Sequence, residues 1–310
     1  MGMESKYIWM NGEMVEYAKA TVHFLTPALH YGLGVFEGIR SYATDDGPAI
    51  FRLREHMTRL INSSKIAGFR TFPFTVDQLV DAACQVVAAN GFVECYVRPL
   101  VYLMDGGWNL NVDFGKPGVG IAAWEWGNYL GKEALDNGIR ANIASFTRHH
   151  PNVTMTKAKI TGNYANSILA KTESMRLGFE EAILLDPQGY VAECTGENLF
   201  VVRDGVLYTP VTAPVLEGIT RDSLVTLAND LGFTVREVPI SRDQLYIADE
   251  VFVCGTAAEC IALCEIDFRT IGAGKMGPVT RSIQQAFQAA IHGKHPRSAQ
   301  WLESVKAHTA

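Results

Sequence analysis

The chain has 310 residues, with 27 Lys and Arg against 33 Asp and Glu, which gives a formal net charge of −6. This balance argues against a nucleic-acid binder, because binding to a phosphate backbone depends on clustered cations. With 48% hydrophobic and 19% charged residues, the composition predicts a soluble globular protein of one large or two medium domains.

The apolar stretches, the first residues and the cysteines of the sequence predict the cellular location. No stretch reaches the roughly 18 uninterrupted apolar residues of a membrane helix, and residues 1–6 lack the apolar core of a signal peptide. The six cysteines form no CxxC pair and mostly lie in apolar runs, which is typical of buried reduced thiols. We therefore expect a cytoplasmic protein.

The first half of the chain predicts a small α+β domain. Two short apolar runs flank Asn11-Gly12, a dipeptide that favours a hairpin turn, so residues 7–17 predict a β-hairpin. Thr75 and Gln78 have the spacing of a capping box at the start of a helix. The remaining expectations are a strand near 49–53, helices over 54–67 and 75–90, and strands over 95–104 and 118–126.

The second half alternates between strand and helix patterns. We expect an N-terminal domain over residues 1–127, a linker over 128–138 and a larger C-terminal domain over 139–310. The predicted strands are 139–146, 181–185, 199–202, 206–208, 234–238 and 251–254; the predicted helices are 164–177, 220–231, a short one capped by Ser241, and 279–291.

Two glycine clusters imitate nucleotide-binding motifs. The glycines between Tyr31 and Gly38 are spaced GxGxxxG, one residue too long for the dinucleotide fingerprint. Gly272-Ala-Gly-Lys275 lacks the Ser or Thr that follows the lysine of a P-loop. Neither cluster supports a nucleotide enzyme.

Two further glycines predict anion sites at helix starts. Gly218 precedes Ile219-Thr220, and Gly255 precedes Thr256, in turns that we expect to open helices. Unpaired N–H groups in a first helical turn and a threonine hydroxyl together suit a phosphate. An ordinary helix cap is the alternative for each.

The central segment contains two pairs of basic residues, His149 with His150 and Lys157 with Lys159. His149 and His150 are adjacent, so on a strand they point to opposite faces, and no nearby Cys or Glu completes a metal site. Lys157 and Lys159 precede a predicted helix. Either lysine is a solvated side chain or a nucleophile, which requires a desolvated, electropositive environment.

Taken together, the motifs resemble those of the fold type IV pyridoxal-phosphate enzymes, and within them the branched-chain amino acid aminotransferases, a group of class IV aminotransferases. The resemblance covers nearly the whole chain. It is carried in order by His30-Tyr-Gly-x-Gly-Val-Phe-Glu-Gly-Ile-Arg40, Arg59, Tyr96-Val-Arg-Pro99, Lys159-x-x-Gly-Asn-Tyr164, Glu193-x-x-Gly-Glu-Asn198, Gly218-Ile-Thr-Arg221, Gly255-Thr-Ala-Ala-Glu259 and Gly277-Pro-Val-Thr280. The resemblance implies a mixed α/β and α+β two-domain fold with the cofactor in the interdomain crevice, and a homodimer or larger homo-oligomer.

The resemblance also implies a cofactor, pyridoxal 5′-phosphate, and its binding residues. Lys159 matches the lysine that bonds to the cofactor and moves the substrate proton. Glu193 matches the partner of the ring nitrogen, and Tyr164 the partner of the ring hydroxyl. The phosphate is implied to contact Arg59, Gly218, Ile219, Thr220, Gly255 and Thr256.

The implied reaction is reversible transfer of an amino group between L-leucine, L-isoleucine or L-valine and 2-oxoglutarate by a ping-pong mechanism. Arg98 matches the arginine that accepts the anionic side chain of glutamate. The residues implied to contact substrate are Tyr31, Phe36, Gly38, Arg40, Tyr96, Arg98, Trp126, Tyr129, Tyr164, Thr256 and Ala257.

Departures from the family pattern leave the donor preference open. Glu259 is followed by Cys-Ile-Ala-Leu, and Trp108 occupies a loop that contacts substrate in the family. The alternatives are a D-amino acid or R-selective amine transaminase, an aminodeoxychorismate lyase, or a non-catalytic metabolite-binding protein of the same fold. Tyr96-x-Arg98-Pro99 favours the branched-chain type.

Overall fold

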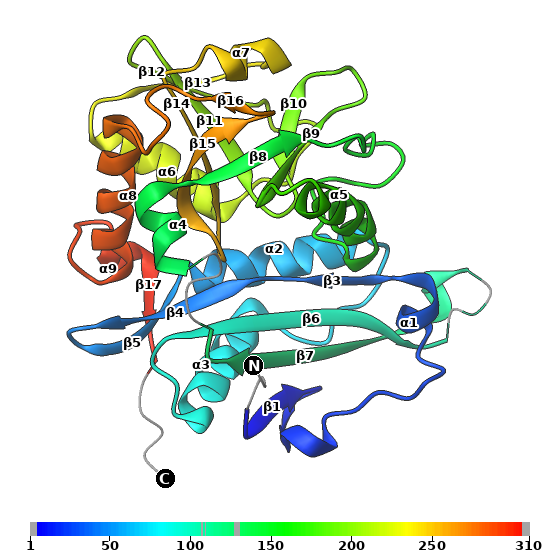
Figure 1. Ribbon diagram of the computed structural model, residues 1–310. Coiled ribbons are helices and arrows are strands. Elements are labelled where there is room, and N and C mark those ends of the chain that lie inside the picture. Colours follow the sequence, from blue (N-terminus) through cyan, green and yellow to red (C-terminus); the bar gives the residue numbers. More distant parts are fainter. Residues whose placement is uncertain (1–4, 107, 109, 127–130, 306–310) are drawn as a thin grey trace. The chain divides into compact units, whose positions relative to one another are not determined.

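The computed structural model describes residues 5–106, 108, 110–126 and 131–305, shown in Figure 1. The chain forms two compact units. The first comprises Met1–Gly127, Ala158–Gly162 and Ala290–Ala310, and the second Asn128–Lys157 and Asn163–Ala289. Among the described residues, no helix is both long and apolar enough to cross a bilayer.

An antiparallel sheet forms the framework of the first unit. Its strands lie in the order β17-β5-β4-β6-β7-β1-β2, with β3 also paired to β6. Their bounds are β1 Tyr7–Met10, β2 Glu13–Glu16, β3 Gly34–Phe36, β4 Ile39–Thr44, β5 Gly47–Phe51, β6 Cys95–Asp105, β7 Lys116–Trp124 and β17 Leu302–Ser304.

Two long helices build the core of this unit against the sheet. Helix α2 (Leu53–Ile66) buries Leu53, Met57 and Leu60, and α3 (Val76–Asn90) repeats the same i, i+4, i+7 spacing with Leu79, Ala83 and Val86. This spacing places the side chains on one face of each helix, and burying a leucine contributes about 1.5–3 kcal/mol. Shorter helices are η1 Tyr17–Lys19, α1 Pro27–Tyr31, η2 Val112–Phe114, η3 Thr161–Asn163 and α9 Ser298–Trp301.

The second unit has a mixed sheet of its own. Its order is β10-β9-β8-β15-β14-β11-β12-β13, with β16 paired to β15. The pairs β8·β9, β8·β15 and β12·β13 are parallel and the others antiparallel. The bounds are β8 Ile139–Ile143, β9 Glu181–Leu185, β10 Val191–Cys194, β11 Asn198–Arg203, β12 Val206–Thr209, β13 Thr234–Glu237, β14 Glu250–Gly255, β15 Glu259–Ile266 and β16 Arg269–Thr270.

Helices of the second unit begin at several of the predicted signals. They are α4 Gly131–Asn137, α5 Tyr164–Arg176, α6 Ile219–Asp230, α7 Arg242–Tyr246 and α8 Pro278–Ile291. The last two residues of α8 belong to the first unit. Apolar side chains of the sheet, among them Leu199, Val253 and Ile261, form the core.

Local sequence signals are confirmed where a turn or cap decides the structure. Asn11 and Gly12 both have positive φ, 53° and 107°, in the turn between β1 and β2. Thr75 and Gln78 form the capping box of α3, and all six cysteines are free thiols.

Two segments differ from their predicted domain. Residues 158–162 belong to the first unit because Ile160 forms a β-bridge with Val35, and 290–310 belong there because β17 pairs with β5. The predicted linker, 128–138, contains helix α4. Pairing between residues far apart in sequence produces these differences, and the domain limits stay a prediction.

One predicted helix start is wrong. Residues 256–258 form the turn of the β14–β15 hairpin, in which Gly255 pairs with Glu259. Glu259 has a positive φ of 58° and begins an apolar strand, so the chain reverses direction there instead of continuing as a helix.

Candidate active site

The segment that carries Lys159 is held by two elements of the first unit. The Lys159 N–H donates to Oγ of Ser63 on α2 at 3.2 Å, and the Lys159 carbonyl accepts from the N–H of Phe36 on β3 at 3.0 Å. The Lys159 Nζ lies 4.9 Å from the centre of the Phe36 ring. The backbone on both sides of this amine is therefore fixed.

Lys157 is engaged differently, in the second unit. Its Nζ donates to the carbonyls of Thr212 and, at 3.4 Å, of Val215, and it forms an ion pair with Glu217 at 3.1 Å. These contacts use the ammonium group to hold residues 212–217, which supports Lys159 over Lys157 as the reactive lysine.

Arg59 forms a bidentate ion pair with a fully buried acid. Its Nε and Nη2 each donate to Glu37 at 2.7 Å, and His56 Nδ1 lies 2.7 Å from Glu37 Oε2. Burial by itself raises the pKa of Glu37, but the charge of Arg59 and hydrogen bonds from Arg59 and His56 bring it down to about 2. Burial lowers the pKa of His56 in spite of the neighbouring carboxylate. A neutral His56 that donates to an ionised Glu37 accounts for both shifts.

Aromatic rings surround Arg98. The guanidinium carbon lies 4.7 Å from the centre of the Phe36 ring, 5.2 Å from that of Tyr96 and 5.8 Å from that of Trp124. Its Nη2 donates to the Tyr96 hydroxyl at 3.2 Å. Arg98 Nε is buried and, within the described residues, has no hydrogen-bond partner. A cation in this environment is suited to an anionic group.

Other predicted substrate residues meet around Tyr96. A Cβ at Gly38 would lie 2.0 Å from the Tyr96 hydroxyl, so only glycine allows this approach. The Tyr96 and Trp126 rings are 4.6 Å apart, and Arg40 Nη2 donates to the Trp126 carbonyl at 3.5 Å.

Tyr31 is apart from this group. Its hydroxyl donates to the carbonyl of Trp108 at 3.3 Å, and the two rings lie 5.7 Å apart. Tyr129 lies outside the described residues.

In the second unit, the predicted ring-nitrogen partner Glu193 belongs to a buried polar network. Arg148 Nε forms an ion pair with Glu193 Oε1 at 2.7 Å. Asn198 Nδ2 and the Leu216 N–H both donate to Oε2 at 3.3 Å. The carboxylate is therefore held at both oxygens.

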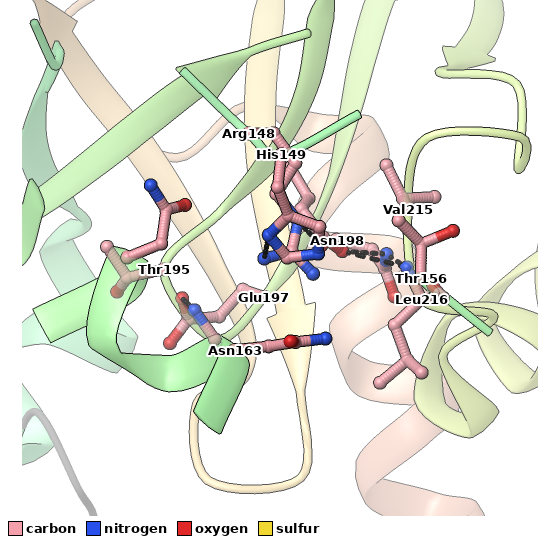
Figure 2. A network of polar contacts seen from close by, with 12 residues as sticks. Arg148, His149, Thr156, Asn163, Thr195, Glu197, Asn198, Val215 and Leu216 are labelled. Carbon is pink, nitrogen blue, oxygen red and sulfur yellow. Dashed lines mark hydrogen bonds and ion pairs between the residues drawn. The ribbon is translucent and has the colours of Figure 1, made fainter. Parts of the chain in front are cut away.

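Arg148 also lies against His149, whose Nδ1 is 3.4 Å from Nη1 (Figure 2). Burial, and then the positive charge of Arg148, lower the pKa of His149 to about 4. No group of three or more metal-ligating side chains occurs in the part of the chain that is described.

Helix α6 presents its first N–H groups beside this network. Gly218 is its N-cap and supplies no side-chain cap; Ile219 and Thr220 form the buried first turn. A Cβ at Gly218 would lie 2.0 Å from Asn198 Oδ1, which explains the glycine. The partial positive charge of this helix end favours an anion.

The hairpin turn at 255–258 lies close to the Glu193–Asn198 motif. Gly255 lies at the end of β14, where a Cβ would be 3.1 Å from the Gly196 carbonyl. Thr256 and Ala257 are half-buried in the turn, and Tyr164 begins α5. Turn N–H groups at 256 and 257 can bind an anion, without the helix end expected there.

The sequence reasoning missed the residues that hold the predicted ones: Glu37, His56, Ser63, Arg148 and Asn198. Two had a usable signal, because His56 and Ser63 are spaced i−3 and i+4 from the predicted Arg59 and so share one face of α2 with it. Glu37 and Asn198 lie within the quoted motifs, yet no role was assigned to either. Arg148 had no local signal.

Comparison with known proteins identifies the family and the fold. The model of the family Amino-transferase class IV matches residues 34–266. A branched-chain-amino-acid aminotransferase from Pseudomonas aeruginosa is 48% identical over 299 residues, which is 96% of this chain and 97% of that protein. Among solved structures, the Escherichia coli branched-chain amino acid aminotransferase has a TM-score of 0.95 and 46% identity, covering 98% of this chain and 100% of the other. The T.th. branched-chain amino acid aminotransferase, complexed with N-(5′-phosphopyridoxyl)-L-glutamate, has a TM-score of 0.92 and 45% identity, with coverage of 98% and 100%.

The chain therefore belongs to the class IV aminotransferases. The predicted family, the fold type IV architecture and the expectation of a transaminase are confirmed.

Proposed function

We propose that this chain is a pyridoxal-phosphate-dependent transaminase that moves the amino group between L-leucine, L-isoleucine or L-valine and 2-oxoglutarate. The observation that carries the proposal is the position of Lys159. Its amine lies over the Phe36 ring on a backbone held by Ser63 and Phe36, while Lys157 is committed to a loop. Relatives that are 46–48% identical are named branched-chain amino acid aminotransferases, which supports the proposal.

The cofactor is pyridoxal 5′-phosphate, and the residues present fit it. The α6 N-terminus lacks a side-chain cap and offers N–H groups at Ile219 and Thr220 to the phosphate. Arg59 supplies a guanidinium of fixed orientation. The buried carboxylate of Glu193, ion-paired with Arg148, suits a protonated ring nitrogen. The phosphopyridoxyl group in the T.th. structure supports the assignment.

Each residue then has a chemical task. When bound, pyridoxal phosphate supplies an electron sink that makes the Cα–H of an amino acid acidic. The Lys159 amine removes this proton as a base and returns it as an acid. Glu193 would keep the ring nitrogen of the bound cofactor protonated, and Tyr164 would donate a hydrogen bond to its ring oxygen. N–H groups of the 256–257 turn bind the α-carboxylate, with the Tyr96 hydroxyl and Arg40.

The substrate residues explain how one enzyme accepts two kinds of side chain. Phe36, Tyr96 and Trp126 offer apolar surface to an aliphatic group, with a gain of about 0.8 kcal/mol for each methylene removed from water. Arg98, whose Nε has no partner in the described part of the chain, receives the side-chain carboxylate of glutamate.

We further propose a cytoplasmic homodimer. The six cysteines are free thiols, as expected in a reducing compartment. Phe24, Leu29 and Trp108 are large apolar residues with 76%, 62% and 45% of their surface exposed, and a second copy of the chain would cover such side chains. Sedimentation equilibrium measures the mass of the assembly.

Borohydride trapping tests the proposed function. The wild type should absorb visible light with the cofactor and yield an adduct on the peptide that contains residue 159. Lys159→Ala should lose the adduct and at least about 10⁴-fold of the transamination rate, since no other amine replaces it. The control, Lys157→Gln, should keep the adduct at 159. An adduct on Lys157 of the wild type would refute the assignment. Assays with L-leucine, D-alanine and R-1-phenylethylamine distinguish the branched-chain type, which should prefer L-leucine.

A further inference from the structure

One buried acid has no task in the reaction described above. Glu37, in the two-residue link between β3 and β4, has no exposed surface. A buried carboxylate is costly unless it is paired and hydrogen-bonded. Glu37 receives three donors at 2.7 Å: Nε and Nη2 of Arg59, and Nδ1 of His56. Its environment is therefore complete.

This pairing has a consequence for the phosphate. The Arg59–Glu37 pair carries no net charge, so the pair by itself does not attract a dianion over distance. Glu37 instead fixes the orientation of the Arg59 guanidinium. A bidentate contact fixes the plane of the guanidinium, which has five N–H groups in a rigid fork, and therefore fixes where the other three point. An unheld arginine would lose side-chain entropy when it ordered around an anion.

The face of α2 connects this pair to the lysine. His56, Arg59 and Ser63 are successive members of one helical face. His56 and Arg59 contact Glu37, and Ser63 contacts the Lys159 backbone. Glu37 is itself followed by Gly38 and preceded by Phe36, which also contacts Lys159. Helix α2 and the neighbouring residues Phe36 and Glu37 thus support both the arginine and the lysine.

We propose that Glu37, supported by His56, is a positioning residue that orients Arg59 for the phosphate of the cofactor. This inference rests on the proposed function, in which Arg59 binds that phosphate. Glutamine cannot replace Glu37, because its single acceptor oxygen serves one side of the fork while its NH₂ group faces another donor. The role should therefore be visible as selectivity for a phosphorylated ligand.

The experiment compares two probes on the full-length enzyme, stripped of cofactor and titrated with pyridoxal 5′-phosphate or with pyridoxal. Absorbance of the lysine adduct reports binding. In Glu37→Gln we expect the dissociation constant for pyridoxal 5′-phosphate to rise about 10-fold or more, which is the cost of about one charge-assisted hydrogen bond. The constant for pyridoxal should change less than about 2-fold, because pyridoxal has no phosphate for Arg59 to bind.

Two comparisons separate positioning from general destabilisation. Glu181→Gln removes another buried, ion-paired carboxylate, the partner of Lys171 in the second unit, and should leave the preference for the phosphorylated probe unchanged. His56→Asn keeps a donor for Glu37 and should retain the preference, whereas His56→Leu removes the donor and should lower it. If Glu37→Gln does not fold, the comparison of His56→Asn with His56→Leu still tests the proposal.

The outcomes are distinct. If Glu37→Gln weakens both probes equally, or neither, or if His56→Asn and His56→Leu behave alike, Glu37 does not position Arg59. If the wild type binds neither probe at Lys159, the proposed function fails instead. A wild type that prefers the phosphorylated probe, with the preference lost in Glu37→Gln, supports both.

Discussion

The two units contain the same kind of ion pair with the roles exchanged. In the first unit a buried carboxylate, Glu37, holds an arginine proposed to contact the cofactor. In the second unit an arginine, Arg148, holds a buried carboxylate with that proposed role. The partner of the functional side chain is in each case a buried residue of opposite charge.

The two ion pairs differ in the contacts that hold the side chain proposed to bind the cofactor. Arg59 brings a planar fork, and Glu37 orients it through two bonds of 2.7 Å. Glu193 has no such fork and is held by Arg148, Asn198 and the Leu216 N–H together. The Glu37 carboxylate thus receives its donors from one helix, α2, whereas the Glu193 carboxylate receives donors from three segments of the second unit.

The largest difference between the pairs should appear in turnover. Glu193→Gln replaces the charge that is proposed to hold the ring-nitrogen proton, and we expect kcat with L-leucine to fall about 10²–10³-fold at saturating cofactor, as for the loss of one preorganised electrostatic contact. Glu37→Gln should act on cofactor retention instead. Steady-state kinetics at several cofactor concentrations separates the two; an unchanged kcat in Glu193→Gln would remove that residue from its role.

Stability should respond when the supporting member of the second pair is removed. Arg148→Leu leaves the buried Glu193 carboxylate without its counter-charge, which should lower the free energy of unfolding by about 3 kcal/mol. Arg148→Lys keeps the charge and should lose less. Urea unfolding at neutral pH measures both, and a wild-type midpoint for Arg148→Leu would show that Asn198 and Leu216 suffice.

The first pair should give a pH signature. The pKa of Glu37 falls from 4.5 to about 2 in the folded chain, so its ionised form stabilises the fold above pH 4.5. That contribution is lost as the pH falls from 4.5 towards 2. Glu37→Gln has no such carboxylate, so its urea midpoint should approach that of the wild type over this range. A constant gap between the two midpoints would contradict the lowered pKa.

The smallest expected effect concerns the backbone of the lysine segment. Ser63→Ala removes the acceptor of the Lys159 N–H and should cost about 1 kcal/mol. The neighbouring Ser64 is an apt control, because its hydroxyl donates at 2.9 Å to the Leu60 carbonyl of the same helix. Hydrogen exchange at the Lys159 amide should accelerate in Ser63→Ala and stay unchanged in Ser64→Ala.

Sequence reasoning was sufficient wherever neighbours along the chain decide the structure. The hairpin turn at Asn11-Gly12 and the capping box of Thr75 with Gln78 depend on residues at most three apart. The order and spacing of the motifs likewise identified the family, because a motif records the residue types that a cofactor requires. These predictions needed no knowledge of which strands pair.

Tertiary structure decided the rest. That residues 158–162 join the first unit depends on long-range contacts: Ile160 forms a β-bridge with Val35, and Lys159 contacts Ser63, which is 96 positions away. Nothing near Lys159 in the sequence specifies these contacts. The same holds for Arg148 beside Glu193, and for the turn at 256–258, where strand pairing overrode a pattern typical of a helix start. Long-range contacts form only when the whole core packs, because the burial that stabilises them is shared among many segments. The residues proposed to do the chemistry could therefore be found in the sequence, but apart from the shared face of α2, the residues that hold them in place could not.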